Sequence, residues 1–200
     1  VAYIDENGVE QTVTDYTVLT ENTSVDNLDG GWYVVEGEVK YTSQVTFNGD
    51  AHLILADGAT MEIETKGESE HGIYASNNLT IYGQNGQSDQ SDQSGTLKVK
   101  TTGDYSDGID SEGNITISGG TVTDTATGSG SYGIYSGGTV EIKDGRVTAT
   151  GNSEGIDSEG NITISGGTVE ASGTNVSGIF AYNDITISGG TVSASGGTSG

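Results

Sequence analysis

The chain has 200 residues and a formal net charge of −23, with 34 glycines, no proline and no cysteine. It contains six basic and 29 acidic residues. The chain therefore lacks the clustered Lys and Arg that neutralise phosphates, which excludes direct binding of nucleic acid or anionic membranes. No apolar run approaches the roughly 18–20 residues of a membrane span, and without cysteine there is no disulfide framework or thiolate zinc site. Low apolar content and high net charge are typical of disordered chains, but the periodicity along the chain indicates a folded one.

Residues 1–30 predict a strand-rich cap. Two short strands, 1–4 and 9–13, flank the dipeptide Asn7-Gly8, which is typical of tight hairpin turns, and a further strand covers 16–19. An open end of stacked strands exposes unpaired backbone groups, so some segment has to cover it. We therefore expect an N-terminal β-hairpin cap at 1–30, followed by a second unit at 31–200.

The second unit is built from repeats. The segment Gly108–Val122 recurs without a change at Gly155–Val169. Aligned on Gly-Ile, successive units begin at residues 72, 108, 133, 155 and 178, which are 36, 25, 22 and 23 residues apart. Each unit contains three short segments in which apolar and polar residues alternate, the period of a half-buried strand.

This pattern predicts an all-β fold, a parallel β-helix or solenoid of about seven coils. One coil cannot bury its own apolar face, whereas stacked coils bury a continuous one. The upstream segments 32–35, 45–47, 53–55 and 61–63 supply about two looser coils. The last residues, 196–200, stop where another Gly-Ile would begin. Either a partner covers the last coil or the repeat array continues beyond the chain end, and we expect the second. We expect the protein to be a monomer or a segment of a longer repeat chain.

One coil carries a polar insertion, residues 84–95, with no large apolar residue. Such an insertion has to leave the coil as an exposed loop, and loops of this kind often lie on a binding face. The interpretation that we favour is a polar loop without a function.

Stacking converts the alignment into columns of side chains along the solenoid. The residue after each Gly-Ile is Tyr74, Asp110, Tyr135, Asp157 or Phe180. Two residues further on, and therefore on the same strand face, lie Ser76, Glu112, Gly137, Glu159 and Tyr182. At the next corner Asn78, Asn114, Thr139, Asn161 and Asp184 align. The first two columns predict an outward face on which aromatic and acidic coils alternate, and the third predicts a structural hydrogen-bonded ladder.

Aromatic rings beside carboxylates suit a sugar ligand, because the rings stack on pyranose C–H faces and the carboxylates accept bonds from hydroxyls. The candidate ligand-binding residues are Tyr74, Asp110, Glu112, Tyr135, Asp157, Glu159, Phe180 and Tyr182. The competing interpretation is that these aromatic residues only pack beneath a loop or beneath a continuation of the chain.

Two groups of carboxylates are candidate metal ligands. One comprises Asp107, Asp110 and Glu112, and the other comprises Glu154, Asp157 and Glu159. Hard oxygen donors favour calcium, although simple solvated acids explain the pattern too. The two histidines, His52 and His71, stand without a convergent third ligand in the sequence, which argues against zinc.

The sequence gives little support for an enzyme. Glycoside hydrolysis needs a correctly spaced acid and base, and a calcium-dependent lyase needs a basic residue beside the metal. Glu70-His71-Gly72-Ile73 is superficially similar to the His-Gly element of polygalacturonases, but their adjacent aspartates and their Arg-Ile-Lys are absent. The candidate bases, Lys98, Lys100, Lys143 and Arg146, lie in or beside the third strand of their coils, away from the acidic column.

The residues also carry a resemblance that covers nearly the whole chain. Segments 31–37 and 45–58, with the tandem Gly-Ile-x-Ser and Ile-Thr-Ile-Ser-Gly-Gly-Thr-Val elements, resemble those of large bacterial surface proteins. The pattern is similar to right-handed parallel β-helices of the pectate-lyase-like superfamily, above all to non-catalytic carbohydrate-binding members and adhesins. The resemblance implies right-handed coils, an extracellular bacterial location, a polysaccharide or cell-surface glycan as partner, and calcium.

Three functions therefore remain open. The sequence favours a non-catalytic extracellular protein that binds glycan or mediates adhesion through its aromatic and acidic face. The alternatives are a structural stalk or spacer of a larger adhesin, and a polysaccharide lyase or glycoside hydrolase.

Overall fold

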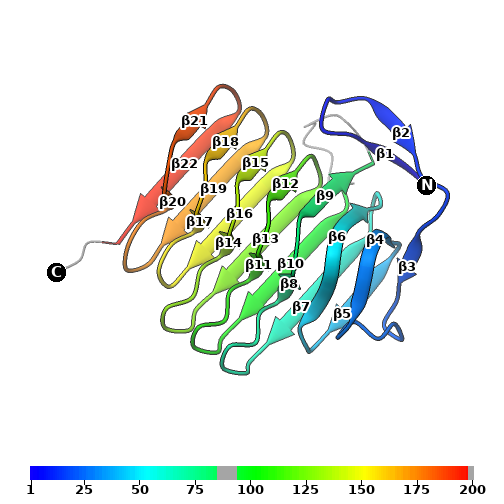
Figure 1. Ribbon diagram of the computed structural model, residues 1–200, viewed down its shortest axis with the longest axis horizontal. Coiled ribbons are helices and arrows are strands. Elements are labelled where there is room, and N and C mark those ends of the chain that lie inside the picture. Colours follow the sequence, from blue (N-terminus) through cyan, green and yellow to red (C-terminus); the bar gives the residue numbers. More distant parts are fainter. Residues whose placement is uncertain (85–93, 198–200) are drawn as a thin grey trace.

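The computed structural model describes residues 1–84 and 94–197, and within them every regular element is a β-strand (Figure 1). No helix in this part of the chain is long and apolar enough to cross a membrane. Most of the predicted insertion at 84–95 lies outside the described residues. The all-β expectation is confirmed.

The repeats form coils of three strands each. The first strands of the five clear repeats are β8 (Ile73–Ala75), β11 (Ile109–Ser111), β14 (Ile134–Ser136), β17 (Ile156–Ser158) and β20 (Ile179–Ala181). The second strands are β9 (Leu79–Gly83), β12 (Ile115–Ile117), β15 (Val140–Ile142), β18 (Ile162–Ile164) and β21 (Ile185–Ile187). The third strands, with those of the two upstream coils, are β5 (Glu38–Tyr41), β7 (Thr60–Thr65), β10 (Thr96–Thr101), β13 (Thr121–Ala126), β16 (Arg146–Gly151), β19 (Thr168–Gly173) and β22 (Thr191–Gly196).

Equivalent strands of the five clear repeats pair in parallel without a slip in register, whereas β4 and β6 upstream shift register between Asp29 and Gly31. Ile109 pairs with Ile73 on one side and Ile134 on the other. The third strands alone make a seven-stranded sheet in the order β22-β19-β16-β13-β10-β7-β5. This arrangement is the predicted parallel β-helix with about seven coils.

The upstream coils differ from the prediction at their first corner. Residues 45–47 and 53–55, expected as separate strands, belong to one long strand, β6 (Val45–Leu55), which pairs with β4 (Leu28–Val35). Gly30 and Gly49 lie back to back there, so close that a Cβ on Gly49 would be 3.1 Å from Gly30 Cα. This close approach lets the backbone run straight through the corner as the single strand β6. Because β6 lies between β8 and β9 in the sheet order, it joins the first and second strands of all coils into one 13-stranded sheet.

The core is a stack of aliphatic side chains inside the coils. Equivalent isoleucines of the middle coils, such as Ile109, Ile134 and Ile156, are fully buried. Burying each such side chain contributes about 1.5–3 kcal/mol, and stacking explains how a chain so poor in apolar residues folds. The last coil has no coil above it in the described residues, so Ile185 is 47% exposed and Ile187 54% exposed.

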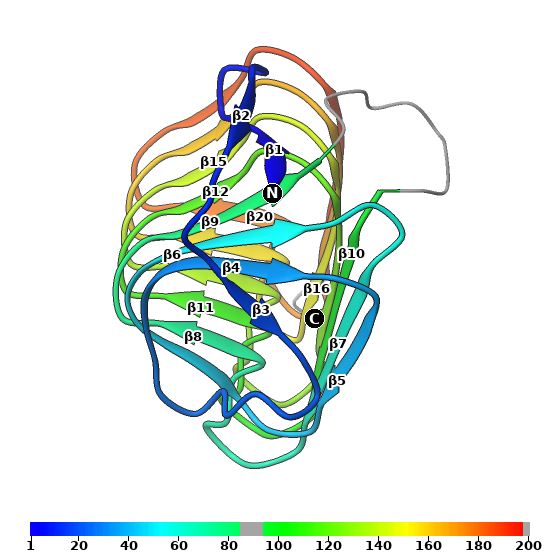
Figure 2. The ribbon, with the colours of Figure 1, turned by 90° about the vertical axis from the view of Figure 1, so that its right-hand side faces the viewer.

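The N-terminal segment forms the predicted hairpin. Strands β1 (Ala2–Ile4) and β2 (Glu10–Thr12) pair antiparallel, and β3 (Thr17–Leu19) adds in parallel to β4. Figure 2 shows β3 lying across the first coil, while the hairpin lies beside an upper corner of the solenoid. Tyr3 from the hairpin packs on Trp32 and Tyr82, with ring centroids 4.8 Å apart in both pairs, so it covers an outward aromatic cluster.

The corner column is a hydrogen-bonded ladder, as expected. Asn78 Oδ1 accepts a bond from the Asn114 amide, and Asn114 Oδ1 accepts bonds from the amide and hydroxyl of Thr139. Asn161 Oδ1 accepts a bond from the Asp184 amide. Each of the three asparagines therefore ties its own coil to the next one, while no such bond is formed by the side chain of Thr139 toward the coil of Asn161.

We predict that Asn114→Ala lowers the free energy of unfolding by about 1–2 kcal/mol. The substitution removes the acceptor for two donors of Thr139, and a hydrogen bond of this kind contributes about 0.5–1.5 kcal/mol net. Urea unfolding followed by circular dichroism measures the effect. Asn22→Ala, at an exposed residue of the N-terminal segment, is the control and should change stability by less than about 0.5 kcal/mol; equal effects would contradict a ladder role.

Candidate functional site

The strand register stacks the predicted outward column residue by residue. Asp110 pairs with Tyr74 on β8 and with Tyr135 on β14, and Asp157 pairs with Tyr135 and Phe180. Each acid is thus held between two aromatic residues of the neighbouring coils, one strand spacing, or about 4.8 Å, away on either side. The structure therefore has the alternation of aromatic and acidic residues that the sequence predicts.

A second column, three residues earlier in each coil, runs beside the first. The residues that precede the Gly of each Gly-Ile are His71, Asp107, Tyr132, Glu154 and Ser177. Two ring pairs connect the columns: His71 stacks on Tyr74 with centroids 6.0 Å apart, and Tyr132 stacks on Tyr135 with centroids 5.5 Å apart. The candidate site is therefore a stripe two columns wide, in which aromatic and acidic coils alternate.

Two acids of the first acidic coil, Asp107 and Asp110, contact His71 of the preceding coil. The amide of Asp107 donates to His71 Nδ1 at 3.1 Å, and a carboxylate oxygen of Asp107 lies 3.5 Å from the same atom. Because Nδ1 accepts this bond, Nε2 carries the hydrogen of the neutral ring. Nε2 lies 3.4 Å from Asp110 Oδ2. Burial lowers the pKa of His71, so these contacts are not ion pairs at neutral pH.

The carboxyls of this coil are buried rather than solvated. Asp107 is 7% exposed and Asp110 is 8% exposed, and Oδ1 of Asp110 has no hydrogen-bond partner. Burial raises the pKa of Asp107 to about 6. Burial, and then the charges of Asp107 and Glu112, raises the pKa of Asp110 to about 7. The alternative of simple solvated acids is wrong for these two residues, because the flanking rings and His71 cover them.

Glu112 belongs to the same coil but stays exposed. It accepts a hydrogen bond of 3.3 Å from the Tyr74 hydroxyl. This carboxylate therefore lies at the solvent side of the stripe, beside an aromatic residue of the preceding coil.

The second acidic coil repeats the first in sequence but has a different neighbour. Its Glu154 is 8% exposed and Asp157 is 7% exposed, while Glu159 is exposed. Burial, and then Glu154 and Glu159, raises the pKa of Asp157 to about 6, and burial raises that of Glu154. The preceding coil supplies Tyr132 here instead of a histidine.

Tyr135 occupies the centre of the stripe, between the two acidic coils. It is half-buried, and burial followed by the charge of Glu159 raises the pKa of its hydroxyl to about 12. The remaining aromatic candidates lie on the last coil, where Phe180 is 45% exposed and Tyr182 is 73% exposed. The structure thus brings the eight ligand candidates onto one face, and no loop among the described residues covers Phe180 or Tyr182.

The isolation of His71 expected from the sequence is wrong. His71, Asp107 and Asp110 each offer one ligand atom within 4.8 Å of the others, which makes a donor set that divalent ions accept. His52, by contrast, stacks on Trp32 at 4.3 Å and belongs to the aromatic cluster under the hairpin. The sequence does contain a signal for His71: it precedes the Gly of its Gly-Ile, at the position that Asp107 occupies in the next coil.

The six metal-ligand candidates do not form one centre. The groups Asp107, Asp110, Glu112 and Glu154, Asp157, Glu159 are separated by the Tyr132–Tyr135 coil, a distance of about 10 Å. In the first group the hydrogen on His71 Nε2 points toward Asp110, where a metal ion would have to bind. A metal at that nitrogen therefore requires loss of this hydrogen.

A further carboxyl of the first acidic coil points into the interior of the solenoid. Asp124 on β13 is fully buried and points inward against Gly108, and neither of its oxygens has a well-formed hydrogen bond, although the amides of Ile109 and Thr125 lie close enough to act on its pKa in the lowering direction. Burial, and then the charge of Asp107, raises its pKa well above the ordinary value. Sequence patterning gave no indication of this residue, because an inward position on this strand is otherwise occupied by Val99 or Ala149.

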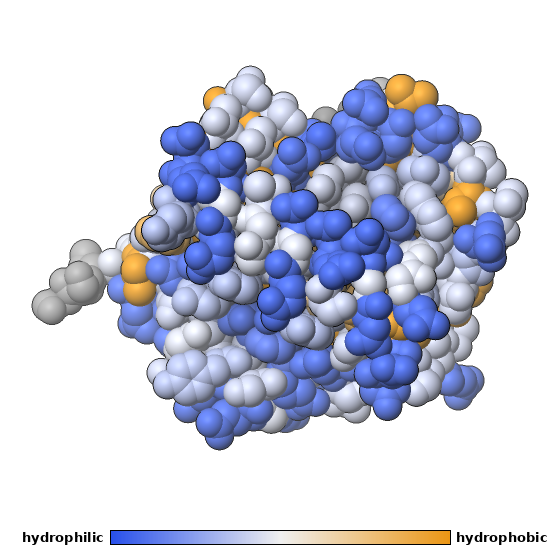
Figure 3. All heavy atoms as spheres, viewed as in Figure 1, coloured by the Kyte–Doolittle hydropathy of each residue, from blue (hydrophilic) through white to orange (hydrophobic). Residues whose placement is uncertain are grey.

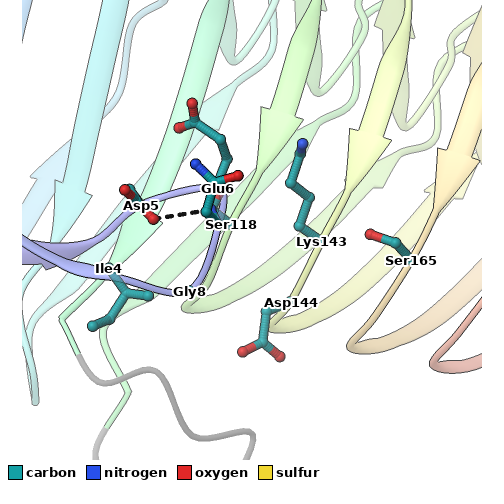
Figure 4. Close-up of a pocket in the computed structure, with 9 residues that line it drawn as sticks. Ile4, Asp5, Glu6, Gly8, Ser118, Lys143, Asp144 and Ser165 are labelled. Carbon is teal, nitrogen blue, oxygen red and sulfur yellow. Dashed lines mark hydrogen bonds between the residues drawn. The ribbon is translucent and has the colours of Figure 1, made fainter.

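A separate cavity of about 250 Å³ lies between the hairpin turn and the corners that follow β12, β15 and β18 (Figure 4). Its lining includes Asp5, Glu6, Ser118, Lys143 and Asp144. The Asp5 carboxylate already accepts bonds from the amides of residues 7 and 9. None of the predicted ligand or metal residues lines this cavity.

The Lys and Arg side chains pair with acids away from the stripe. The ion pairs are Lys40–Glu62, Lys98–Glu62, Lys66–Glu64, Lys100–Glu64, Lys143–Glu141 and Arg146–Glu170. They lie on the outer faces of the third strands and on β15 and its corner. Figure 3 shows a face covered mainly by hydrophilic residues, with small apolar spots scattered toward both ends of the solenoid.

Fold and site together define a parallel β-helix with an exposed aromatic and acidic stripe. A family model described as "Carbohydrate-binding domain-containing protein" matches residues 14–200. The chain belongs to this carbohydrate-binding family, and the match leaves out the β1–β2 hairpin. No curated protein and no solved structure matches the chain.

Proposed function

We propose that this protein binds an extended glycan along the stripe formed by the columns of His71 and Tyr74. The observation that carries the proposal is the alternation of rings and carboxylates, fixed by the strand register on one face of a carbohydrate-binding domain. Rings spaced by two coils offer stacking surfaces to sugar rings, and the exposed Glu112 and Glu159 accept bonds from hydroxyl groups. A chain of sugars would lie along the solenoid axis.

The finer parts of the proposal rest on the resemblance of the repeats. We place the protein among right-handed β-helices of the pectate-lyase-like superfamily, as a non-catalytic protein of the bacterial surface that binds glycan or mediates adhesion. The Lys and Arg side chains pair with acids elsewhere, and the one imidazole beside the carboxyls of the stripe, His71, is only 18% exposed, which supports binding without lyase chemistry. The chain then acts as a monomer or as a segment of a longer repeat array.

Calcium is one partner for the stripe's carboxylates. The ligands would be Asp107, Asp110 and Glu112 in one coil, and Glu154, Asp157 and Glu159 in the other. A bound divalent ion would relieve the repulsion among these acids, since oxygen donors are what calcium prefers. Only the oxygens would bind it, because imidazole is not a ligand that calcium favours.

A glycan array tests the function. We expect the purified chain to bind a subset of linear polysaccharides, and mass spectrometry to detect no released oligosaccharides. Repeating the array with calcium and with a chelator separates metal-dependent from direct binding. Binding to no glycan in either condition would support the structural stalk instead, and released products would support the lyase or hydrolase.

A further inference from the structure

The cavity beside the hairpin has one wall made by the hairpin turn, and this wall has a fixed shape. The Asp5 carboxylate accepts bonds from the amides of Asn7 and Val9 and from the side-chain amide of Gln11. The packing of the Tyr3 ring, described above, anchors the hairpin on the solenoid. Sites for small ligands are usually formed before the ligand arrives, and this wall meets that condition.

The opposite wall consists of corner residues from three successive coils. Ser118, Lys143 and Ser165 each come directly after the second strand of their coils, β12, β15 and β18. Ser118 lies beside the hairpin turn (Figure 4) and is only 3% exposed, whereas Ser165 is exposed. The cavity is therefore closed beside Ser118 and open toward Ser165, on a different face of the solenoid from the stripe.

The open part of the lining offers both hydrogen-bond donors and acceptors. Lys143 Nζ lies 3.1 Å from a Glu141 oxygen, which leaves two of its three donors for a ligand. Asp144 uses Oδ1 on the amide of the next residue and keeps Oδ2. The Glu6 carboxylate and the Ser165 hydroxyl make no hydrogen bond with the residues that the structure describes. A sugar hydroxyl both donates and accepts, so it can pair with the ammonium group and a carboxylate at once.

The same lining disfavours ions. Three acids, Asp5, Glu6 and Asp144, share the cavity with the single cation Lys143, so an anionic ligand meets net negative charge. A metal ion meets the Lys143 ammonium group, and the Asp5 carboxylate is already occupied by the turn. Within the described part of the chain, the only convergent group of possible metal ligands is the one around His71, outside this cavity. A neutral polyhydroxyl ligand fits better than either ion.

The size of the cavity limits the ligand to one small ring. Its volume of about 250 Å³ is below the roughly 300–1,000 Å³ of pockets that hold drug-sized ligands. Ile4 contributes an apolar side chain to the otherwise polar lining, and this surface suits the C–H groups of a sugar ring. The cavity therefore has room for one sugar unit and not for a chain of them.

We propose that this cavity binds a single neutral sugar unit, the end or a branch of a glycan, through Lys143, Asp144, Glu6 and Ser165. The hairpin that forms one wall lies outside residues 14–200, which match the carbohydrate-binding family, so the cavity adds a site to the matched domain. This inference goes beyond the proposed function, because the cavity shares no residue with the stripe.

Ligand-observed NMR and calorimetry with the methyl glycosides of glucose, galactose and mannose test the proposal, with methyl glucuronide as the anionic comparison. These single units are too short to span the stripe. We expect at least one neutral glycoside to bind with a roughly millimolar Kd. The glucuronide should bind at least about 5-fold more weakly, because like charges repel.

Filling the cavity by Ser165→Phe should weaken glycoside binding at least about 10-fold, since the ring takes the place of the sugar. Ser188→Phe is the matched control and should bind as the unsubstituted chain does, because Ser188 occupies the equivalent exposed corner one coil further on, outside the cavity lining. Lys143→Met should also weaken binding, whereas Lys98→Met, which breaks an ion pair on the third strands, should not. Melting curves show that each variant is folded.

Three results would overturn the proposal: no glycoside binds, the glucuronide binds as tightly as the neutral sugars, or both Phe variants lose the same affinity. The glycan array reports separately on the stripe. A positive array without glycoside binding leaves the proposed function standing and removes the cavity site. Glycoside binding that Ser165→Phe abolishes, together with a negative array, keeps the cavity site and removes the stripe.

Discussion

Replacing Asp124 by valine should stabilise the protein at neutral pH by about 1–3 kcal/mol, the cost typical of a buried polar group without a partner. Asp124 is fully buried, neither of its oxygens has a well-formed hydrogen bond, and the nearby amides of Ile109 and Thr125 do not offset the effect of burial on its pKa. One coil earlier, Val99 occupies the equivalent inward position and packs against Gly72 as Asp124 does against Gly108. Valine therefore fits this site in the neighbouring coil.

The stabilisation by Asp124→Val should depend on pH. Burial raises the pKa of Asp124 in the folded state well above its value of about 3.9 in an unfolded chain. The folded state then binds the proton more tightly, so this carboxyl favours folding at low pH and loses that contribution as pH rises through the folded-state pKa. Asp107, Asp110 and Asp157 change the stability in the same direction, because their pKa values are also raised, to about 6, 7 and 6.

Thermal unfolding of both proteins between about pH 5 and pH 8 measures the effect. We expect the melting temperature of the unsubstituted chain to fall as pH rises over this range, and Asp124→Val to melt higher by about 2–4 °C per kcal/mol gained. Asp124→Asn is the control that removes the charge but keeps a polar group. A destabilised valine variant would show that the carboxylate has a functional partner inside the solenoid.

Replacing Tyr135 by alanine should weaken glycan binding by about 10-fold, or roughly 1.4 kcal/mol. Tyr135 is half-buried between Asp110 and Asp157 and stacks on Tyr132. Removing it takes away the ring shared by both acidic coils, so neither half of the stripe keeps its full set of contacts. Aromatic residues at the centre of a binding face commonly dominate its affinity.

Titration of whichever glycan the array identifies measures this loss, with Tyr135→Phe expected to keep most of the affinity. Tyr16→Ala, at a tyrosine in the N-terminal segment that is 37% exposed, is the matched control and should bind as the unsubstituted chain does. Melting curves of each variant separate a loss of contacts from a loss of folding. Unchanged affinity for Tyr135→Ala would move the binding face away from this stripe.

The sequence determined the architecture because stacking copies one local pattern many times. Gly-Ile at the coil start and Ile-Thr-Ile in the second strand predict three strands per coil, and equivalent residues pair without a slip. The corner asparagines likewise predict their own ladder, since a side chain that bonds to the next coil needs only the repeat spacing. The family match agrees with the carbohydrate partner that the aromatic and acidic columns predicted.

Other features needed the tertiary structure because they depend on distances between coils. Which acids are buried was decided by the rings of neighbouring coils, so Asp110 and Asp157 are covered while Glu112 and Glu159 remain exposed. His71 joins the site through contacts with residues 36 and 39 positions later. Asp124 points inward in the regular register of β13, at a position where the neighbouring coils have a small or aliphatic residue, and only its packing shows that the carboxyl is sealed from water. Sequence period fixes what stacks on what, whereas burial and charge coupling arise only when neighbouring coils are packed together.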